Sequence, residues 1–522
     1  MSKAERILLA AAGAASVVLR LVALFRYRFD SDEQQHLHVA WGWTQGLVQY
    51  RDYFDNHAPL FHLLTAPILA LFGERANILL WMRVPMLALF AFVVWATYAL
   101  ARRLYDARVA AWAAVLLSLF PPFFLKSLEY RTDNLWNAFW MAALVVLALK
   151  PWTPRWTFLA GLLLGCAMSV SLKTTLLLAT LAGAAAIVRW IEKRGDALSP
   201  LLPLLGGLVL VPAILVVLFV ALGAWDRLVW CVFTFNENIV LTRRSVWIGR
   251  VAWPFAMAAL VYAAMRLRPK THDSARFFFA VAIGVYVITL GGFWVLISPR
   301  DLLSLMPLAA IFVAAMLVRA RNPLQAFAIA VVVLLLALVH YANQFRNDTR
   351  WHTTMMAQAL RLTHPGELLL DLKGETIYRR RPFYYVLENI TRAQMAHGLI
   401  PDTLAADVIR TRTHVAQADG PMWPPQGRAF LSANFLDMGR LRASGQWLRD
   451  DGTFTIAVPG EYTIVSERGE VRGTLDGTPF TGARTLASGA HRFAGPREKL
   501  AVVWAPAIQR GHSPFHLRDR EF

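Results

Sequence analysis

The stretch ILLAAAGAASVVLRLVALF, residues 7–25, decides the class of this protein. A helix that crosses a bilayer needs roughly 20 mostly apolar residues, and this run supplies them. The basic residues Lys3 and Arg6 precede it, and Arg26 and Arg28 follow it in place of the small residues of a signal-peptide cleavage site. We therefore interpret the run as a first membrane span that is retained.

Apolar runs of this kind recur along the chain. Of its 522 residues 57% are hydrophobic, and the mean hydropathy is +0.44, whereas a soluble domain is about 45–50% apolar. We expect an all-α, polytopic membrane domain with about eleven transmembrane helices. The expected spans are 7–28, 77–100, 109–125, 134–149, 156–172, 174–190, 201–223, 251–266, 277–298, 302–318 and 323–342.

Positive charge gathers in the loops on one side of this arrangement. The formal net charge is +19. With eleven spans, five basic loops fall on the same side as the N-terminus, which the positive-inside rule makes cytoplasmic. Attraction to anionic lipid explains this charge, and no basic stripe with interleaved aromatic residues indicates nucleic acid. The basic loops lie near 102–108, 150–155, 189–194, 266–270 and 319–321.

Hydrophobicity falls after Tyr341. We therefore predict two domains: residues 1–343 form the membrane domain, and residues 344–522 form a mixed α/β domain on the extracytoplasmic side. In the second domain we expect a helix near 404–412. Alternating apolar and polar residues between 453 and 504 predict a small terminal β-sheet.

The membrane domain has a long first outer loop, residues 29–76. It is too long and too patterned to be a simple linker. Residues 34–43 are typical of an amphipathic helix, and residues 59–72 are apolar enough to lie along the membrane interface as a second helix.

This loop begins with a pair of acids, Asp32 and Glu33, just past the first span. Carboxylates so close to hydrocarbon are costly unless they face protein or water. A carboxylate held by its neighbours can act as a general base near an acceptor hydroxyl. The alternative is a pair of solvated loop acids at a helix N-terminus, where negative charge is mildly favourable.

A second polar group follows in the segment YRDYFDNHAP, residues 50–59. Tyr53, Asp55 and His57 are candidate substrate-binding residues. A histidine beside a carboxylate can bind a phosphate as a cation or ligate a metal. The alternative is ordinary loop polarity before a helix, with Pro59 near its first turn.

The next outer loop contains Arg131 and Asp133, in the segment EYRTDN that starts at Glu129. The two residues either form a structural ion pair at the membrane surface, or Asp133 faces the same cavity as Asp32. We interpret both as site residues, with Asp133 in the catalytic group.

Two further cations break apolar stretches on the same side. Lys173 and Arg300 either snorkel to the membrane surface, as long basic side chains do, or hold a lipid phosphate. Arg243 and Arg244 are interpreted as surface charge.

No metal or cofactor site stands out. His36 and His38 lie close to Asp32, and this spacing could hold a divalent cation, but no third ligand at metal spacing is evident. Cys166 and Cys231 are the only cysteines, so no disulfide framework can form. The chain lacks a phosphate-binding glycine loop, a nucleophile elbow and a dinucleotide fingerprint, which leaves ATP-driven transport unsupported.

The first-loop pattern resembles that of the membrane glycosyltransferases of the GT-C type. It is most similar to the branch of protein mannosyltransferase-like, aminoarabinose transferase-like and bacterial lipid-A-core sugar transferases. The resemblance rests on a first span, the pair Asp32-Glu33, the cluster at 50–59 and the acid Asp133. It covers roughly residues 1–340.

The resemblance implies a mechanism. Such enzymes take a sugar from a polyprenyl-phosphate lipid on the outer leaflet and pass it to an acceptor hydroxyl, usually with inversion. Asp32 would then be the general base, with Glu33 and Asp133 orienting the acceptor or the base. A cation must neutralise the phosphate that leaves.

The chain departs from aminoarabinose-type relatives at two cationic positions. It has Asn56-His57 where they place a lysine, and Gln35 where they place an arginine. His57, Lys173 and Arg300 are therefore the substitutes that we expect to bind the phosphate.

The expected partners are a polyprenyl-phosphate-sugar donor, the lipid bilayer and a glycan, lipid or protein acceptor such as lipopolysaccharide in the cell envelope. The family likeness implies the bacterial inner membrane, with a periplasmic C-terminal domain. Two other functions remain open. One is a transporter or flippase of lipid-linked sugars, a class that often has paired repeats and broken helices. The other is a non-catalytic membrane scaffold or oligosaccharide-binding protein that uses the terminal sheet.

Overall fold

The computed structural model describes residues 1–193, 201–239, 246–266, 274–295, 297–342, 346–418 and 420–517. Arg243 and Arg244, together with the basic-loop residues Arg194, Arg268 and Lys270, lie outside these ranges. The chain forms two compact units. The helical unit comprises Met1–Arg28, Asn56–Thr65 and Leu80–Asn347, and the mixed unit comprises Phe29–Asp55, Ala66–Leu79 and Asp348–Phe522. The expected first outer loop, residues 29–76, thus contributes to both units.

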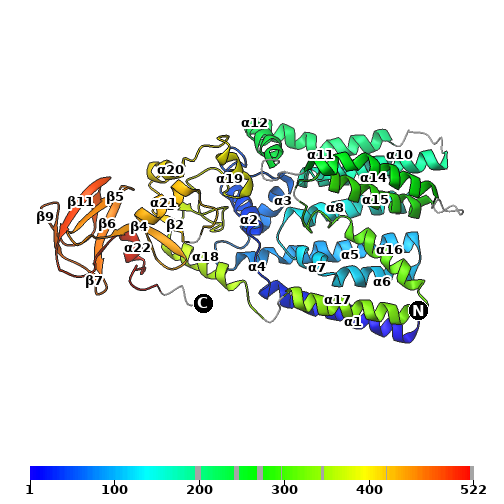
Figure 1. Ribbon diagram of the computed structural model, residues 1–522, viewed down its shortest axis with the longest axis horizontal. Helices are drawn as coiled ribbons and strands as arrows, with labels where there is room; N and C mark the ends of the chain where they lie inside the picture. The colour runs from blue at the N-terminus through cyan, green and yellow to red at the C-terminus, as the bar shows by residue number, and fades with distance from the viewer. Residues whose placement is uncertain are drawn as a thin grey trace. The chain divides into compact units, whose positions relative to one another are not determined.

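Long helices dominate the helical unit, and each expected span coincides with one of them (Figure 1). Eight helices of the described part are long and apolar enough to cross a membrane by length and composition, which confirms the predicted polytopic architecture. The number of crossings stays a prediction, because α6, α9 and α16 are shorter. The long helices are α1 (Lys3–Arg26), α5 (Val84–Leu104), α6 (Ala107–Leu119), α8 (Thr132–Leu149), α9 (Pro154–Val170), α10 (Thr174–Glu192), α11 (Leu201–Ala221), α14 (Val246–Arg266), α15 (Ser274–Phe293), α16 (Met306–Val318) and α17 (Pro323–Ala342). Shorter helical segments are α3 (Leu60–Ala70), which begins in this unit, α4 (Ile78–Met82), α7 (Pro121–Lys126), α12 (Trp225–Val229), the π-helical turn η1 (Trp230–Thr234) and α13 (Phe235–Glu237).

Helix α6 is the most enclosed element of the helical unit, because α1, α5, α16 and α17 all pack against it. Its Trp112 stacks on Phe327 of α17 with ring centroids 4.2 Å apart. The indole Nε1 of Trp112 donates to Glu5 Oε1 of α1 at 2.7 Å, and Arg108 Nε lies 2.8 Å from the same oxygen. A buried carboxylate is thereby paired, and three helices are tied together.

Helices α9 and α11 pack backbone to backbone. A Cβ atom on Gly161 would lie 2.0 Å from the Leu204 carbonyl oxygen, and one on Gly207 would lie 2.2 Å from the Phe158 carbonyl oxygen. Small residues permit this close approach of membrane helices, where van der Waals packing replaces the hydrophobic effect. The glycines are therefore required by the packing.

Two β-sheets form the C-terminal part of the mixed unit (Figure 1). The predicted sheet between 453 and 504 is confirmed, whereas β1 to β4 were not expected, because these strands are short or poor in β-branched residues. The eight-stranded sheet has the order β1 (Leu369–Leu370), β2 (Val415–Gln417), β4 (Leu441–Trp447), β12 (Ala501–Trp504), β6 (Gly460–Ser466), β10 (Arg484–Leu486), with β3 (Phe435–Asp437) paired to β4 and β7 (Gly469–Glu470) paired to β6. The four-stranded sheet has the order β5 (Thr453–Ile456), β11 (Gly489–Ala494), β8 (Gly473–Leu475), β9 (Thr478–Phe480). Strands β1 and β2 are parallel, and the other pairs are antiparallel.

Helices complete the mixed unit. They are α2 (Ser31–Thr44), α18 (Arg350–Leu362), α19 (Asn389–Ala396), α20 (Leu404–Arg410), α21 (Pro425–Asn434) and α22 (Ala505–Gln509). Helix α20 agrees with the helix expected near 404–412. Met355, Ala359 and Leu362 lie on one face of α18, at i, i+4 and i+7, and join the apolar core of the sheets.

Helix α2 corrects one expectation. It covers the predicted helix at 34–43, but it is buried on all sides from Glu33 to Gly42 and is not amphipathic. Two of its polar residues bond within the mixed unit: His38 Nδ1 donates to the Ile377 carbonyl oxygen at 2.7 Å, and Gln35 Nε2 donates to Asp55 Oδ1 at 3.3 Å. A helix that carries such polar contacts inside a protein need not have a wet face.

Candidate active site

The turn between α7 and α8 positions a group of charged side chains in the helical unit. Asn134 at the start of α8 donates to the Glu129 carbonyl oxygen at 2.6 Å and fixes the turn. The Tyr130 hydroxyl donates to Thr65 Oγ1, also at 2.6 Å. With the backbone held in this way, the side chains of Glu129 and Arg131 are buried.

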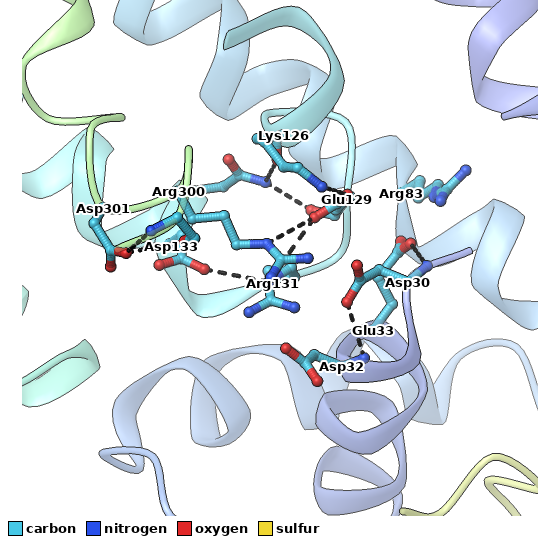
Figure 2. A network of polar contacts seen from close by, with 12 residues as sticks. Asp30, Asp32, Glu33, Arg83, Lys126, Glu129, Arg131, Asp133, Arg300 and Asp301 are labelled. Atoms are coloured by element: carbon cyan, nitrogen blue, oxygen red, sulfur yellow. Dashed lines mark hydrogen bonds and ion pairs between the residues drawn. The ribbon is translucent and has the colours of Figure 1, made fainter. Parts of the chain in front are cut away.

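Glu129 is the centre of this group. Its carboxylate is fully buried and lies 2.6 Å from Lys126 Nζ and 3.3 Å from Arg300 Nε. Arg131 Nε is 4.0 Å away. Figure 2 shows this carboxylate facing the three cations. We call the group the Glu129 cluster; its members are Lys126, Glu129, Arg131, Asp133, Lys173, Arg300 and Asp301.

Lys173 joins the two remaining carboxylates of the cluster. Its Nζ lies 2.8 Å from Asp133 Oδ1 and 2.7 Å from Asp301 Oδ1. Arg131 Nε lies 3.2 Å from the other oxygen of Asp133. Asp301 also accepts from the backbone N–H and the hydroxyl of Ser298, at 2.8 and 2.9 Å. Lys173 is thus held inside an ion-pair network instead of snorkelling to the surface.

The cluster has an excess of positive charge. Lys126, Arg131, Lys173 and Arg300 face the three carboxylates, so it carries one net positive charge. Arg300 and Lys173 keep 18% and 23% of their side chains exposed and are the most accessible of the members. Cations that are partly shielded from water bind phosphate more strongly than surface cations do. The arrangement can therefore bind an anion.

Asp32 belongs to the mixed unit and lies in the first turn of α2. Its Oδ1 lies 2.5 Å from Lys373 Nζ, which also approaches Glu388 Oε2 at 3.3 Å. We call these three residues the Asp32 cluster. Burial lowers the pKa of Lys373, but the carboxylates of Asp32 and Glu388 outweigh it and raise the pKa above the usual value. Lys373 is therefore charged at neutral pH and forms an ion pair with Asp32.

A tight loop presents Lys373. Asp371 accepts from the backbone N–H groups of Gly374 and Thr376, both at 2.8 Å. Gly374 has φ +94°, and a Cβ atom there would lie 2.6 Å from the side chain of His38. Only glycine fits this position, so the loop closes directly on α2.

Glu33 has a structural contact. Its carboxylate accepts from the Asp30 backbone N–H at 2.9 Å, and Asp30 caps α2 in turn, which makes a capping box (Figure 2). The buried Glu33 side chain thus fixes the start of the helix that carries Asp32.

Tyr53 and Asp55 are also bound within the mixed unit. The Tyr53 hydroxyl donates to the Val39 carbonyl oxygen at 3.1 Å, and burial raises the pKa of Tyr53 well above the usual value. Asp55 accepts from the side-chain amides of Gln35 and Gln49, at 3.3 and 2.7 Å. Tyr53 and Lys373 line the same small cavity of about 30 Å³, which is room for about one water molecule.

His57 lies in the helical unit and is half-buried. Its neighbour Asn56 accepts at its backbone carbonyl oxygen from Asn236 Nδ2 at 2.9 Å, which ties this segment to the helices near η1.

The structure supplies no metal site within its described ranges. No group of three or more His, Cys, Asp or Glu side chains there could hold a metal ion. His38, one of the candidate ligands, uses Nδ1 for the Ile377 carbonyl oxygen and stacks on Trp41.

The structure brings together four of the residues that the sequence singled out, namely Arg131, Asp133, Lys173 and Arg300. Asp32, Glu33, Tyr53 and Asp55 gather in the mixed unit. The sequence did not single out Lys126, Glu129 and Asp301 as site residues, although they stand in or beside the candidate segments. Lys373 is 341 residues from Asp32 and had no local signal.

Comparison with known proteins gives a family match and a fold. Residues 56–221 match the family model described as dolichyl-phosphate-mannose-protein mannosyltransferase. No curated protein matches the sequence.

Two solved structures of one protein are similar in fold, and a third structure matches with a lower TM-score. ArnT from Cupriavidus metallidurans bound to undecaprenyl phosphate has a TM-score of 0.55 at 13% identity, covering 83% of this chain and 97% of that chain. The apo state of the same protein has a TM-score of 0.54 at 14% identity, with the same coverage of 83% and 97%. The oligosaccharyltransferase AglB from Archaeoglobus fulgidus, in complex with an inhibitory peptide and a dolichol-phosphate, has a TM-score of 0.47 at 12% identity, covering 94% of this chain and 74% of that chain. The GT-C fold and the resemblance to the GT-C glycosyltransferases are confirmed.

Proposed function

We propose that this GT-C type membrane glycosyltransferase moves a sugar from a polyprenyl-phosphate donor to an acceptor hydroxyl, with inversion at the anomeric carbon. The acceptor belongs to a glycan, lipid or protein of the cell envelope. The reaction takes place at the outer face of a bacterial inner membrane, with the N-terminus in the cytoplasm and the C-terminal domain in the periplasm.

The comparisons support this class of donor. The matched family is named for a dolichyl-phosphate sugar, and the ArnT structure holds undecaprenyl phosphate. Apolar side chains on the surface of the helical unit suit such a lipid: Val217 on α11 and Phe255 on α14 are 69% and 73% exposed.

One observation carries the proposal: the Glu129 cluster holds more cations than carboxylates in a largely buried setting. When the bond from sugar to phosphate breaks, negative charge grows on the phosphate oxygen. Arg300, Arg131 and Lys173 would stabilise this charge, since preorganised cations act most strongly where water is excluded. Asp133 orients Lys173 and Arg131, which is a different role from the orientation of the acceptor or the base that was expected for it.

The base of the reaction is Asp32. Its carboxylate accepts the proton of the acceptor hydroxyl while the acceptor oxygen bonds to the anomeric carbon. The bond between that carbon and the phosphate oxygen breaks, and its electron pair stays on the polyprenyl phosphate. Glu33 orients Asp32 through the start of α2.

Tyr53, Asp55 and His57 remain predicted substrate-binding residues. Tyr53 is supported by the cavity that it shares with Lys373, the partner of Asp32. Asp55 would act through Gln35 and Gln49, which occupy both of its carboxylate oxygens.

The test uses the full chain reconstituted with undecaprenyl-phosphate-linked pentoses and hexoses and an envelope extract as the acceptor. Release of undecaprenyl phosphate is followed by mass spectrometry. Replacing Asp32 by Asn should lower the rate by roughly 10²- to 10⁴-fold, because the proton acceptor is removed.

Asp450→Asn is the matched control, since Asp450 is an exposed acid of the same unit. It should keep the wild-type rate. A wild-type rate in Asp32→Asn, with normal folding, would remove Asp32 from the mechanism. Movement of intact donor across the vesicle membrane without release of undecaprenyl phosphate would show a flippase instead.

A further inference from the structure

A second cavity lies in the mixed unit, among the strands of the eight-stranded sheet. It opens between the turn that precedes β2, the start of β6 and the end of β12. Its volume is about 360 Å³, within the range of roughly 300–1,000 Å³ that small-molecule sites occupy. We call it the Trp504 pocket; Glu367, Arg412, His414, Gly460 and Trp504 are among the residues that line it.

Two stacked rings make one wall of this pocket. The His414 imidazole lies 5.1 Å from Trp504, centroid to centroid, at an interplanar angle of 7°. Gly460 leaves space for the imidazole, because a Cβ atom there would lie 2.5 Å from His414 Cε1. Trp504 is 7% exposed, and the Arg510 guanidinium also lies over its ring, 5.1 Å from the centroid. The half-buried His414 imidazole is therefore the part of this wall that the C–H face of a sugar ring can contact.

His414 also offers a polar atom to the pocket. Its Nδ1 bonds to Ser444 Oγ at 2.8 Å, whereas Nε2 has no hydrogen-bond partner among the described residues. Burial lowers the pKa of His414 to about 4, so the ring is neutral at pH 7. A neutral imidazole nitrogen can exchange a hydrogen bond with a hydroxyl group.

Arg412 gives the pocket its charge. Its guanidinium is exposed and forms no ion pair with a carboxylate of the described part of the chain. The one carboxylate among the lining residues, that of Glu367, is already neutralised by Arg510, whose Nη1 and Nη2 lie 2.7 and 2.8 Å from its two oxygens. The pocket therefore has one uncompensated positive charge.

The end of α20 places Arg412 at the pocket. Arg412 follows the C-cap Thr411 and has a left-handed φ of +51°, as residues after a helix C-cap commonly do. The backbone N–H of Thr413 donates to the Val408 carbonyl oxygen at 3.0 Å and closes the helix end. The turn that holds the cation is therefore part of the regular fold.

We propose that the Trp504 pocket binds one unit of an anionic saccharide. The sugar ring lies against the wall of His414 and Trp504, a hydroxyl group bonds to His414 Nε2, and the carboxylate or phosphate substituent pairs with Arg412. The site is separate from the Glu129 and Asp32 clusters, and it does not rest on the proposed sugar transfer.

The experiment measures binding to the full chain in detergent by saturation-transfer NMR and calorimetry. The probes are glucuronate, glucose 6-phosphate, glucose and inorganic phosphate. We expect the two charged sugars to bind at least ten times more tightly than glucose or inorganic phosphate. The relative affinity of glucuronate and glucose 6-phosphate tells whether a carboxylate or a phosphate is preferred.

Two variants of the pocket locate the binding. Arg412→Asn removes the charge and keeps a residue that tolerates positive φ, so the fold is kept and the affinity for charged sugars should fall at least tenfold. Gly460→Ala displaces the imidazole and should weaken charged and neutral sugars alike. Arg472→Asn, at an exposed arginine between β7 and β8, should bind like the wild type.

Several outcomes would overturn the proposal. They are equal binding of glucose and glucuronate, binding of inorganic phosphate as tight as that of the sugars, no binding of any probe, and unchanged affinity in Arg412→Asn. Because no turnover is involved, loss of transfer in Asp32→Asn leaves this result unaffected.

Discussion

The Glu129 cluster and the Asp32 cluster are both networks of carboxylates and cations, but their charges differ in sign. By the members named above, the first contains four cations and three carboxylates, and the second contains the ammonium of Lys373 and the carboxylates of Asp32 and Glu388. An excess of cations favours a phosphate, and an excess of carboxylates favours the acceptance of a proton. The two halves of a sugar transfer to a hydroxyl need these two environments.

The largest expected effect contrasts the two clusters by removing a carboxylate from each. Glu129→Gln leaves buried cations without their counter-ion and should destabilise the protein by about 3–5 kcal/mol. Glu388→Gln removes a partly exposed carboxylate, with 21% of its side chain accessible, and should cost about 1 kcal/mol or less. Thermal unfolding in detergent measures both. Equal losses would show that burial does not distinguish the two networks.

The next effect concerns the phosphate. Arg300→Ala should lower kcat by about 10²- to 10³-fold, as loss of one charge-stabilising donor does, while the fold is kept. Arg319→Ala changes an exposed arginine at the end of α16 and serves as the control. Steady-state kinetics on the undecaprenyl-phosphate-linked donor provide the measurement. A rise in KM with an unchanged kcat would mean that Arg300 contributes to donor binding alone.

Substitutions of Lys373 test the Asp32 cluster. Lys373→Met should lower kcat by roughly 10- to 100-fold, because Asp32 loses the contact that orients it. Lys373→Arg should restore part of the rate, and Lys499→Met, at an exposed lysine of the same unit, should have no effect. If Lys373→Arg is as slow as Lys373→Met, the positive charge is not what Asp32 needs.

The smallest expected effect is a change of stability with pH. Burial and the neighbouring Asp371 raise the pKa of Glu375 from 4.5 to about 7. The folded state therefore binds a proton more tightly than the unfolded state does, so this contribution to stability is complete below pH 4.5 and is lost as the pH rises through 7. Tm should fall by roughly several degrees between pH 5 and 8.

Glu375→Gln should reduce the fall of Tm between pH 5 and 8. Glu467→Gln, at an exposed glutamate, should leave that fall unchanged. An unchanged slope in Glu375→Gln would place the pH dependence elsewhere, and the mixed unit would then hold one more ionised carboxylate near Lys373.

Most of the helical unit could be predicted from the sequence, because a run of apolar residues is a local signal. The mixed unit is harder to predict from the sequence. Strands as short as β1 and β2 owe their form to their neighbours, and α2 is buried on faces that carry polar side chains. The spacing of apolar residues in the sequence reveals neither the short strands nor the burial of α2.

The candidate site divides in the same way. Arg131 and Asp133 were found because charge in an apolar setting is conspicuous, and Lys173 and Arg300 for the same reason. Glu129 resembles an ordinary loop acid in the sequence, because its burial and its contact with Arg300 arise only in the tertiary fold. Lys373 lies in an ordinary polar loop, and only the tertiary fold brings it to Asp32.

The glycine contact between α9 and α11 limits which substitutions these two helices can accept. A methyl group at Gly161 or Gly207 would collide with a carbonyl oxygen of the other helix, whereas Val217 of α11 stands 69% exposed. A saturation scan of α11 should therefore show a single narrow stripe of intolerance on a surface that accepts almost any apolar residue. Two helices packed in this way should move as one rigid body. Lipid chains around them can then exchange without separating the pair.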